Sequence, residues 1–191
     1  MLSDTRSLIV RHGLDVRFRP MAVRRVFDET GGLPLPKRHP VRQRYRLVEL
    51  QRWREKRGLP LNLQPKFAGM DTTLADRSVI ALIANGRDPD AFVRLAGATQ
   101  WANELDLSAP DVLADLLAKS GTPDPAAILA GAASTTTAAE LEANYDAALS
   151  AGVFGVPSFV LDGEVFWGQD RLELLYDALK SGRAPFRPMI S

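Results

Sequence analysis

The sequence predicts an α/β protein in which a block of helices separates an N-terminal helix and strand from a C-terminal hairpin. Three observations support this prediction. Apolar and charged residues alternate over Leu14–Pro20, which is typical of a half-buried strand. Helical patterns with start and stop signals run from about residue 41 to 135. Two apolar runs, 158–161 and 165–167, flank Asp162-Gly163, a dipeptide that favours a two-residue hairpin turn.

The remaining elements follow from local signals. Residues 1–12 predict the end of a helix that is closed by Gly13. Residues 28–40 hold three prolines and two adjacent glycines, and so predict a loop. Polar side chains stand where helix N-caps are favoured, before or within the first turn of an apolar pattern. These expected caps are Asp88, Ser108, Asp124, Thr137 and Asp170, the last paired with Glu173.

Composition excludes several classes of protein. A length of 191 residues allows one domain, or one domain with an insertion. The absence of Cys excludes disulfides, thiolate catalysis by the chain and Cys-ligated zinc, and the two His residues are isolated, so we expect no metal site. No apolar stretch is long enough for a membrane span and no signal peptide is visible, so we expect a cytoplasmic protein without a membrane partner.

The net charge of +1 hides a strong asymmetry. Residues 1–66 hold 16 Lys+Arg and 6 Asp+Glu, a net of +10, whereas residues 67–191 have a net of −9. Such asymmetry fits either nucleic-acid or anion binding or two solvated faces of opposite charge. The basic residues lack the interleaved aromatics of a stacking surface, which favours the solvated faces and no nucleic-acid partner.

Several motifs carry a family resemblance. The segment GVFGVPSFVLDGEVFWGQDRLELL, together with RHGLDVRFRP, TGGLPLP and GLPLNLQPKF, resembles the 2-hydroxychromene-2-carboxylate isomerases and the related kappa-class glutathione transferases, within the DsbA-like branch of the thioredoxin superfamily. The resemblance implies a thioredoxin-like fold with an inserted all-helical domain. We expect residues 1–32 and 137–191 to form the thioredoxin-like domain and residues 33–136 to form the helical insertion.

The same resemblance implies a strand and a Ser-Pro-Tyr loop before the first helix. Counted back from Arg11-His12-Gly13, Met1 falls inside that helix, so the first strand and the catalytic Ser are missing from this sequence and we expect them upstream. Ser3 and Ser7 have no following Pro-Tyr, and we assign neither as catalytic. We therefore expect the 191-residue chain by itself to bind glutathione weakly and to show no turnover.

Two segments match the family's glutathione-binding positions. Val156 and Pro157 correspond to the pair beside glutathione, and we predict a cis bond between them, although a trans turn fits the local sequence as well. Trp167, Gly168, Gln169 and Asp170 correspond to the segment that holds the γ-glutamyl end. A helix start there would favour a carboxylate, whereas Asp170 could instead accept from an ammonium group or act only as a helix cap.

Arg42 and Tyr45 lie where the family places a basic residue and a tyrosine near the ligand, and we name them as candidate substrate-binding residues. A solvated basic face with one buried Tyr explains the same pattern.

The resemblance implies a glutathione-dependent isomerase that acts on small aromatic oxo acids of the 2-hydroxychromene-2-carboxylate type. The alternatives are a kappa-like glutathione transferase and a non-catalytic, truncated protein that binds glutathione or a peptide. The resemblance also implies glutathione as cofactor and a possible homodimer. Whether the chain is itself an enzyme stays open at this point, because no catalytic residue is assigned.

Overall fold

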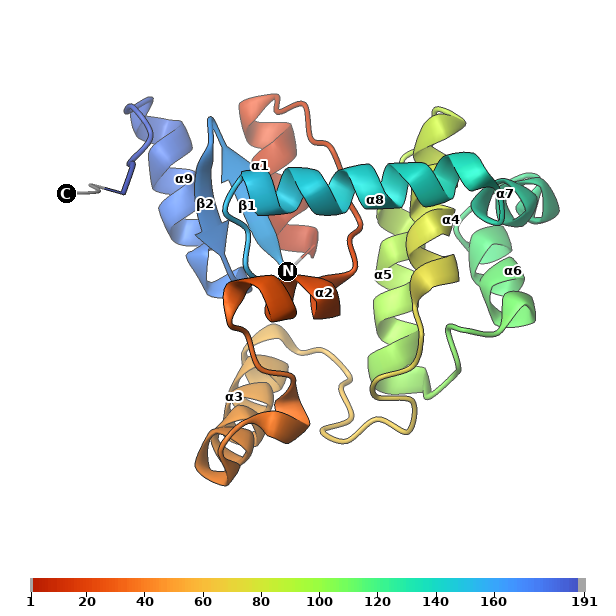
Figure 1. Ribbon diagram of the computed structural model, residues 1–191, viewed down its shortest axis with the longest axis horizontal. Coiled ribbons are helices and arrows are strands. Elements are labelled where there is room, and N and C mark those ends of the chain that lie inside the picture. The colour runs from red at the N-terminus through yellow and green to blue at the C-terminus, as the bar shows by residue number, and fades with distance from the viewer. Residues whose placement is uncertain (1, 189–191) are drawn as a thin grey trace. The chain divides into compact units, whose positions relative to one another are not determined.

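The computed structural model describes residues 2–188, with side chains from residue 5 onward, and the chain divides into two compact units (Figure 1). The hairpin unit comprises the N-terminal part up to Gly32 and the C-terminal part from Ala143. The helical unit comprises Leu33–Glu142. One long helix, α8 (Thr135–Ser150), continues from the helical unit into the hairpin unit.

The hairpin unit contains two N-terminal helices, a two-stranded sheet and a C-terminal helix. Besides the end of α8, its elements are α1 (Leu2–His12), α2 (Val23–Thr30), β1 (Ser158–Leu161), β2 (Glu164–Trp167), the 3₁₀ turn η3 (Gln169–Arg171) and α9 (Leu172–Ser181). The expected N-terminal helix is confirmed, and Gly13 closes it with a φ of 59°. Helix α2 has no counterpart among the sequence-based expectations.

The C-terminal hairpin forms where the sequence predicts it. Strands β1 and β2 pair antiparallel, with Phe159 opposite Phe166 and Leu161 opposite Glu164. The connecting residues Asp162 and Gly163 both have positive φ, 50° and 80°. Two positive φ values in a two-residue loop define the turn type that matches the twist of the flanking strands, and this explains the Asp-Gly dipeptide.

One face of the hairpin forms the core of this unit. Phe166 is buried together with Leu172, Leu175 and Ala178 of α9, and the partly buried side chains of Leu8, Phe159, Leu161 and Leu179 pack against this cluster. Helix α1 therefore contacts the hairpin unit's core through Leu8. The α9 residues follow the 3–4 spacing of an amphipathic helix, as the sequence predicts.

The expected strand Leu14–Pro20 is wrong. These residues form no regular secondary structure, and Val16 is exposed. A strand needs a neighbouring strand to accept its backbone hydrogen bonds, and among the described residues the sheet contains only β1 and β2. The segment is instead held by isolated hydrogen bonds: the Leu14 N–H donates to the Ile9 carbonyl over 3.1 Å, and Arg19 Nη1 donates to Asn144 Oδ1 over 3.3 Å.

The helical unit is an all-α bundle. Its elements are the 3₁₀ turn η1 (Leu35–Lys37), α3 (Pro40–Arg57), α4 (Thr73–Ala84), α5 (Asp90–Ala98), the π-helical turn η2 (Thr99–Asn103), α6 (Pro110–Lys119), α7 (Pro125–Ala132) and the start of α8. Its most buried large side chains are Leu82 of α4, Phe92 of α5 and Leu113 and Leu117 of α6. Helix α3 contributes no buried residue, so its contacts with the unit are peripheral.

The predicted helix starts are confirmed only in part. Asp124 caps α7 by accepting from the Ala127 N–H over 3.0 Å. Asp88 accepts from the Asp90 N–H but stands two residues before α5. The cap at Ser108 is wrong, because α6 begins after Ala109 without a side-chain cap. The cap at Thr137 is wrong because its buried hydroxyl donates to the Ala132 carbonyl, inside a helix that has already begun.

Two kinds of feature are absent from the part of the chain that the structure describes. None of the helices is both long and apolar enough to span a bilayer. Across residues 2–188, His, Asp and Glu side chains form no group of three or more that could hold a metal ion.

Asp76, in the first turn of α4, provides a test of the helical unit by pH. Burial raises the pKa of its carboxyl to about 6, and this outweighs the Thr72 hydroxyl, which donates to Oδ2 over 3.1 Å and lowers the pKa. Because the folded chain holds this proton more tightly than the unfolded chain, the contribution of Asp76 to stability is lost as pH rises from about 4 to above 6.

We therefore predict that the Asp76→Asn variant loses less unfolding free energy than the parent chain does when the pH is raised from 4 to 7.5. The unfolding free energy of the variant, relative to the parent chain, should rise by about 1–3 kcal/mol between these pH values. Urea titration at both pH values measures it. A difference between variant and parent that does not change with pH would contradict the raised pKa.

Candidate functional site

The candidate site in the hairpin unit begins immediately before β1. The Val156-Pro157 peptide bond is cis, as the sequence predicts. The Pro157 carbonyl accepts from the Gly168 N–H over 2.9 Å, which extends the hairpin by one residue pair beyond Ser158 and Trp167. The two candidate glutathione-binding segments, 156–157 and 167–170, are thus adjacent parts of one hairpin.

The pairing leaves the other edge of β1 free. In an antiparallel ladder, alternate residues point their N–H and C=O groups toward the partner strand. Since Pro157 and Phe159 face β2, the main-chain groups of Val156, Ser158 and Val160 face away from it. Among the described residues, no backbone hydrogen bond reaches Val156, and its residue surface is 53% exposed. This edge can accept an extended peptide ligand, which would pair with it as another strand does.

Trp167 is held by the turn that leads into β1. The Phe154 ring lies 4.8 Å from the Trp167 ring, centroid to centroid, at a tilt of 60°. Gly155 is buried against the same indole, and a Cβ at this position would lie only 2.6 Å from Trp167 Nε1. Gly155 is therefore required for the indole to lie beside the cis peptide, where nearly half of the residue surface remains exposed.

Gly168 and Asp170 form the turn that follows β2. Gly168 has a φ of 106°, a conformation that L side chains rarely adopt, and a Cβ there would collide with the Asp170 carboxylate. The expected cap by Asp170 is wrong, because Asp170 lies within η3 and α9 begins only at Leu172. Its carboxylate instead forms an ion pair with Arg171 Nη1 at 2.5 Å.

The Asp170–Arg171 pair is at the surface, with each side chain about half exposed. Exposed ion pairs contribute little free energy, about 0–1 kcal/mol. The Asp170 carboxylate can therefore accept hydrogen bonds from a cationic ligand at little cost. The side-chain amide of Gln169 has no hydrogen bond to any of residues 2–188, so it is also available.

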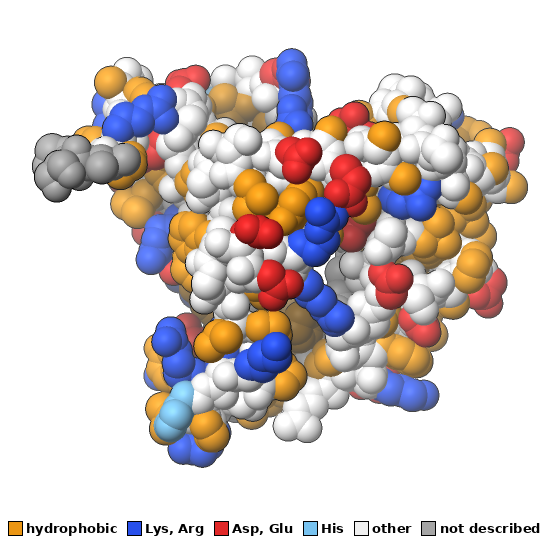
Figure 2. Space-filling view, in the orientation of Figure 1, with side chains coloured by type: hydrophobic (Ala, Val, Ile, Leu, Met, Phe, Trp, Pro, Cys, Tyr) orange, Lys and Arg blue, Asp and Glu red, His pale blue; other side chains and the backbone are white. Residues whose placement is uncertain are grey.

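Arg42 and Tyr45 belong to the helical unit, where they lie on α3. Tyr45 is exposed rather than buried, and the Arg52 guanidinium lies 5.9 Å from its ring centroid. Hydrogen bonds from Arg52 and then Tyr45 lower the pKa of Glu49. Lys and Arg side chains alternate with apolar ones over the surface of α3 (Figure 2). Arg42 itself makes no ion pair with any described residue.

No pattern in the sequence indicates the cavity of about 450 Å³ in the helical unit, which is lined in part by Arg44, Arg46 and Trp101. Its lining residues come from positions 35 to 101, so no local pattern marks them as a group. The alternation of Arg42, Arg44 and Arg46 along α3 was visible as basic character only.

Comparison with known proteins decides the family. The profile of the DSBA-like thioredoxin domain matches residues 2–180. The chain belongs to the DSBA-like thioredoxin domain family. Since the profile spans both units, the two-stranded hairpin and the helical unit are parts of one DSBA-like thioredoxin fold.

The chain is similar to proteins named 2-hydroxychromene-2-carboxylate isomerase. A 2-hydroxychromene-2-carboxylate isomerase from Sphingobium xenophagum is 29% identical over 86% of this chain and 83% of its own length. The corresponding protein from Pseudomonas putida is 27% identical over 88% and 81%. A solved structure of 2-hydroxychromene-2-carboxylate isomerase superposes with a TM-score of 0.78 at 26% identity, covering 94% of this chain and 88% of that one. The resemblance to this isomerase family is confirmed.

The positive φ of Gly168 predicts how a substitution at this position changes the free energy of unfolding. Gly168→Ala should lower the free energy of unfolding by about 1–3 kcal/mol, because the new side chain is strained and displaces Asp170. Gly97→Ala is the matched control, since it lies within α5 with open space at its Cβ position, and it should be neutral or stabilising. Denaturant titration measures both. Equal stability of Gly168→Ala and the parent chain would contradict the turn geometry.

Proposed function

We propose that the protein is a glutathione-dependent isomerase of aromatic oxo acids of the 2-hydroxychromene-2-carboxylate type. The observation that carries this proposal is the relationship to isomerases of that name over more than four-fifths of their length. The free edge at Val156 and the adjacent Asp170 turn support the glutathione dependence, because they suit a short peptide that carries an ammonium group.

The residues of the hairpin unit fit glutathione by their chemistry. The unpaired main chain of Val156 offers one donor and one acceptor to the ligand's own peptide groups. The carboxylate of Asp170 and the amide of Gln169 offer acceptors and a donor for the ammonium and carboxylate of the γ-glutamyl end. Pro157 and Trp167 lie next to this edge in the same hairpin. When bound, glutathione supplies a thiol nucleophile that adds to a conjugated oxo acid.

The helical unit supplies positive charge for the acid. In this proposal Arg42 binds the substrate carboxylate by charge-assisted hydrogen bonds, and Tyr45 offers its hydroxyl and the edge of its ring. No residue of the chain is assigned to the activation of the thiol. Ser7 lies exposed on α1, and neither it nor Ser3 is assigned a role.

Binding of glutathione tests the proposal at the level of the site. Calorimetric titration of the 191-residue chain should show saturable binding, and Asp170→Asn should weaken it about tenfold, as expected for the loss of a charge-assisted hydrogen bond. Asp146→Asn is the matched control, because Asp146 is exposed on α8 in the same unit and makes no ion pair with a described residue. Equal weakening by both variants would contradict the assignment of Asp170.

A measurement of enzymatic turnover tests whether the protein catalyses the proposed isomerisation. The protein purified from its natural source should interconvert 2-hydroxychromene-2-carboxylate and its ring-opened oxo acid isomer only when glutathione is added. Arg42→Gln, introduced into that protein, should raise the KM for the acid about tenfold and leave the binding of glutathione unchanged. Interconversion at the same rate without glutathione would refute the dependence. Binding without any interconversion would identify a glutathione-binding protein that is not this isomerase.

A further inference from the structure

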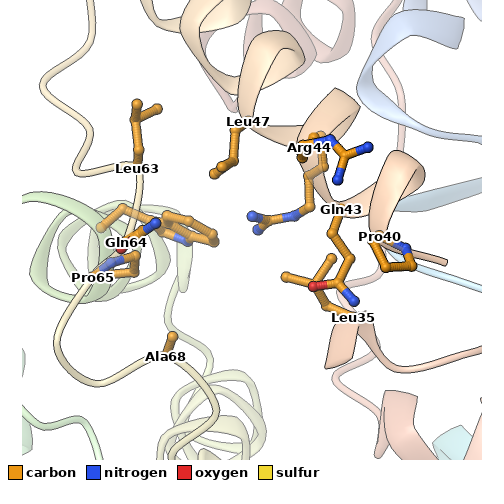
Figure 3. Close-up of a pocket in the computed structure, with 11 residues that line it drawn as sticks. Leu35, Pro40, Gln43, Arg44, Leu47, Leu63, Gln64, Pro65 and Ala68 are labelled. Atoms are coloured by element: carbon orange, nitrogen blue, oxygen red, sulfur yellow. The ribbon is translucent and has the colours of Figure 1, made fainter. Parts of the chain in front are cut away.

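The cavity in the helical unit is lined by four segments: the 3₁₀ turn η1, α3, the loop over residues 61–68 and the π-helical turn η2. Its volume of about 450 Å³ lies in the range of small-molecule sites. Arg44 and Leu47 from α3, and Leu63 and Pro65 from the loop, surround the open space (Figure 3). The cavity is therefore mainly apolar, with guanidinium groups on the α3 side.

The walls of this cavity are fixed to each other by hydrogen bonds. The Asn62 N–H donates to the Trp101 carbonyl over 2.7 Å, and the Asn62 side-chain amide donates to the Ala102 carbonyl over 3.3 Å. On the other side, Arg54 Nη1 donates to the Leu61 carbonyl over 3.4 Å. The loop is thus tied both to η2 and to α3, so the cavity exists before a ligand binds.

Arg46 has a positive charge in this cavity and no anionic partner. It is half-buried, and among residues 5–188 no carboxylate or carbonyl accepts a hydrogen bond from it or from Arg44. Its guanidinium carbon lies 5.7 Å from the Trp101 ring centroid. Burial, and then the charge of Arg38, lower the pKa of Arg46. A cation that is partly desolvated, close to a second cation and without a partner would be stabilised by an anion.

The backbone around Trp101 has an unusual conformation. Trp101 lies in the π-helical turn Thr99–Asn103, which is followed by Glu104 with a φ of 55°. π-helical turns are rare and occur frequently at functional sites. The turn places the indole against the cavity and directs the Trp101 carbonyl to Asn62. An indole face with apolar neighbours suits a planar ring.

We propose that this cavity binds an aryl carboxylate, with the ring against Trp101, Leu47 and Leu63 and the carboxylate on Arg46 and Arg44. An arginine fork matches a carboxylate in two parallel hydrogen bonds, which no neutral ligand can reproduce. The site lies wholly in the helical unit and none of its residues belongs to the glutathione-binding set. It therefore goes beyond the proposed function, and binding is expected whether or not the protein isomerises its substrate.

The test uses 2-naphthoate as the probe, titrated calorimetrically into the 191-residue chain without glutathione. Saturable binding of one equivalent is expected. Arg46→Gln and Trp101→Leu should each weaken it about tenfold, whereas Arg87→Gln, which removes an exposed arginine of the same unit outside the cavity, should leave it unchanged. The neutral analogue 2-naphthylmethanol should bind at least tenfold more weakly than the acid.

Three outcomes would overturn the proposal. These are the absence of binding, equal affinity for acid and alcohol, and equal losses from Arg46→Gln and Arg87→Gln. Circular dichroism checks that each variant folds, and if Trp101→Leu does not, the comparison of Arg46→Gln with Arg87→Gln decides alone. Because no turnover is measured, failure of the isomerase assay leaves this test unaffected.

Discussion

The packing of the Phe159–Phe166 pair against α9 is the constraint on which the hairpin unit depends. These two residues are directly opposite each other in the ladder, and Leu172 and Leu175 cover them. Packing on this face fixes the register, because a one-residue slip would turn every side chain of the strand to the opposite face. The register in turn decides which main-chain groups of β1 are used by β2 and which remain free.

The candidate site is a consequence of that register. With the main chain of Phe159 and Pro157 directed to β2, the N–H and C=O of Val156, just before the strand, have no backbone partner among residues 2–188. The same pairing brings Gly168 opposite Pro157, so that the Asp170 turn begins where the free edge begins. Two segments that are ten residues apart in the sequence thus form one recognition surface, and the glycines at 155 and 168 leave room for the indole and the carboxylate within it.

Sequence patterns predicted those parts of the fold whose determinants are local. The hairpin has its turn dipeptide, its two apolar runs and its pairing partners within ten residues, so all of them were visible together. The Leu14–Pro20 segment has the alternation of a strand, but a strand exists only where another strand accepts its hydrogen bonds, and that is not a local property. Helix α2 was missed although Val23, Val26 and Phe27 have the i, i+3, i+4 spacing of an amphipathic helix, because a helix of eight residues holds only one such repeat.

The same distinction between local and long-range determinants applies to the candidate sites. The family resemblance singled out Val156, Pro157 and Trp167–Asp170, and the structure brings these residues together on one hairpin. It did not single out the cavity beside α3, whose residues are distant in the sequence and are brought together in part by the hydrogen bonds of Asn62 and Arg54. An Arg on a basic helix carries no sign in the sequence that it lines a cavity rather than a solvated face.

Amide hydrogen exchange of the hairpin, with and without glutathione, tests the central claim most directly. In the free protein the Phe159 and Phe166 amides should be protected by the ladder, while the Val156 amide should exchange rapidly because it has no partner. Saturating glutathione should slow exchange at Val156 at least tenfold and leave the rates at Phe159 and Phe166 unchanged. Exchange at Val156 that is already slow in the free protein, or that does not respond to bound glutathione, would contradict the account.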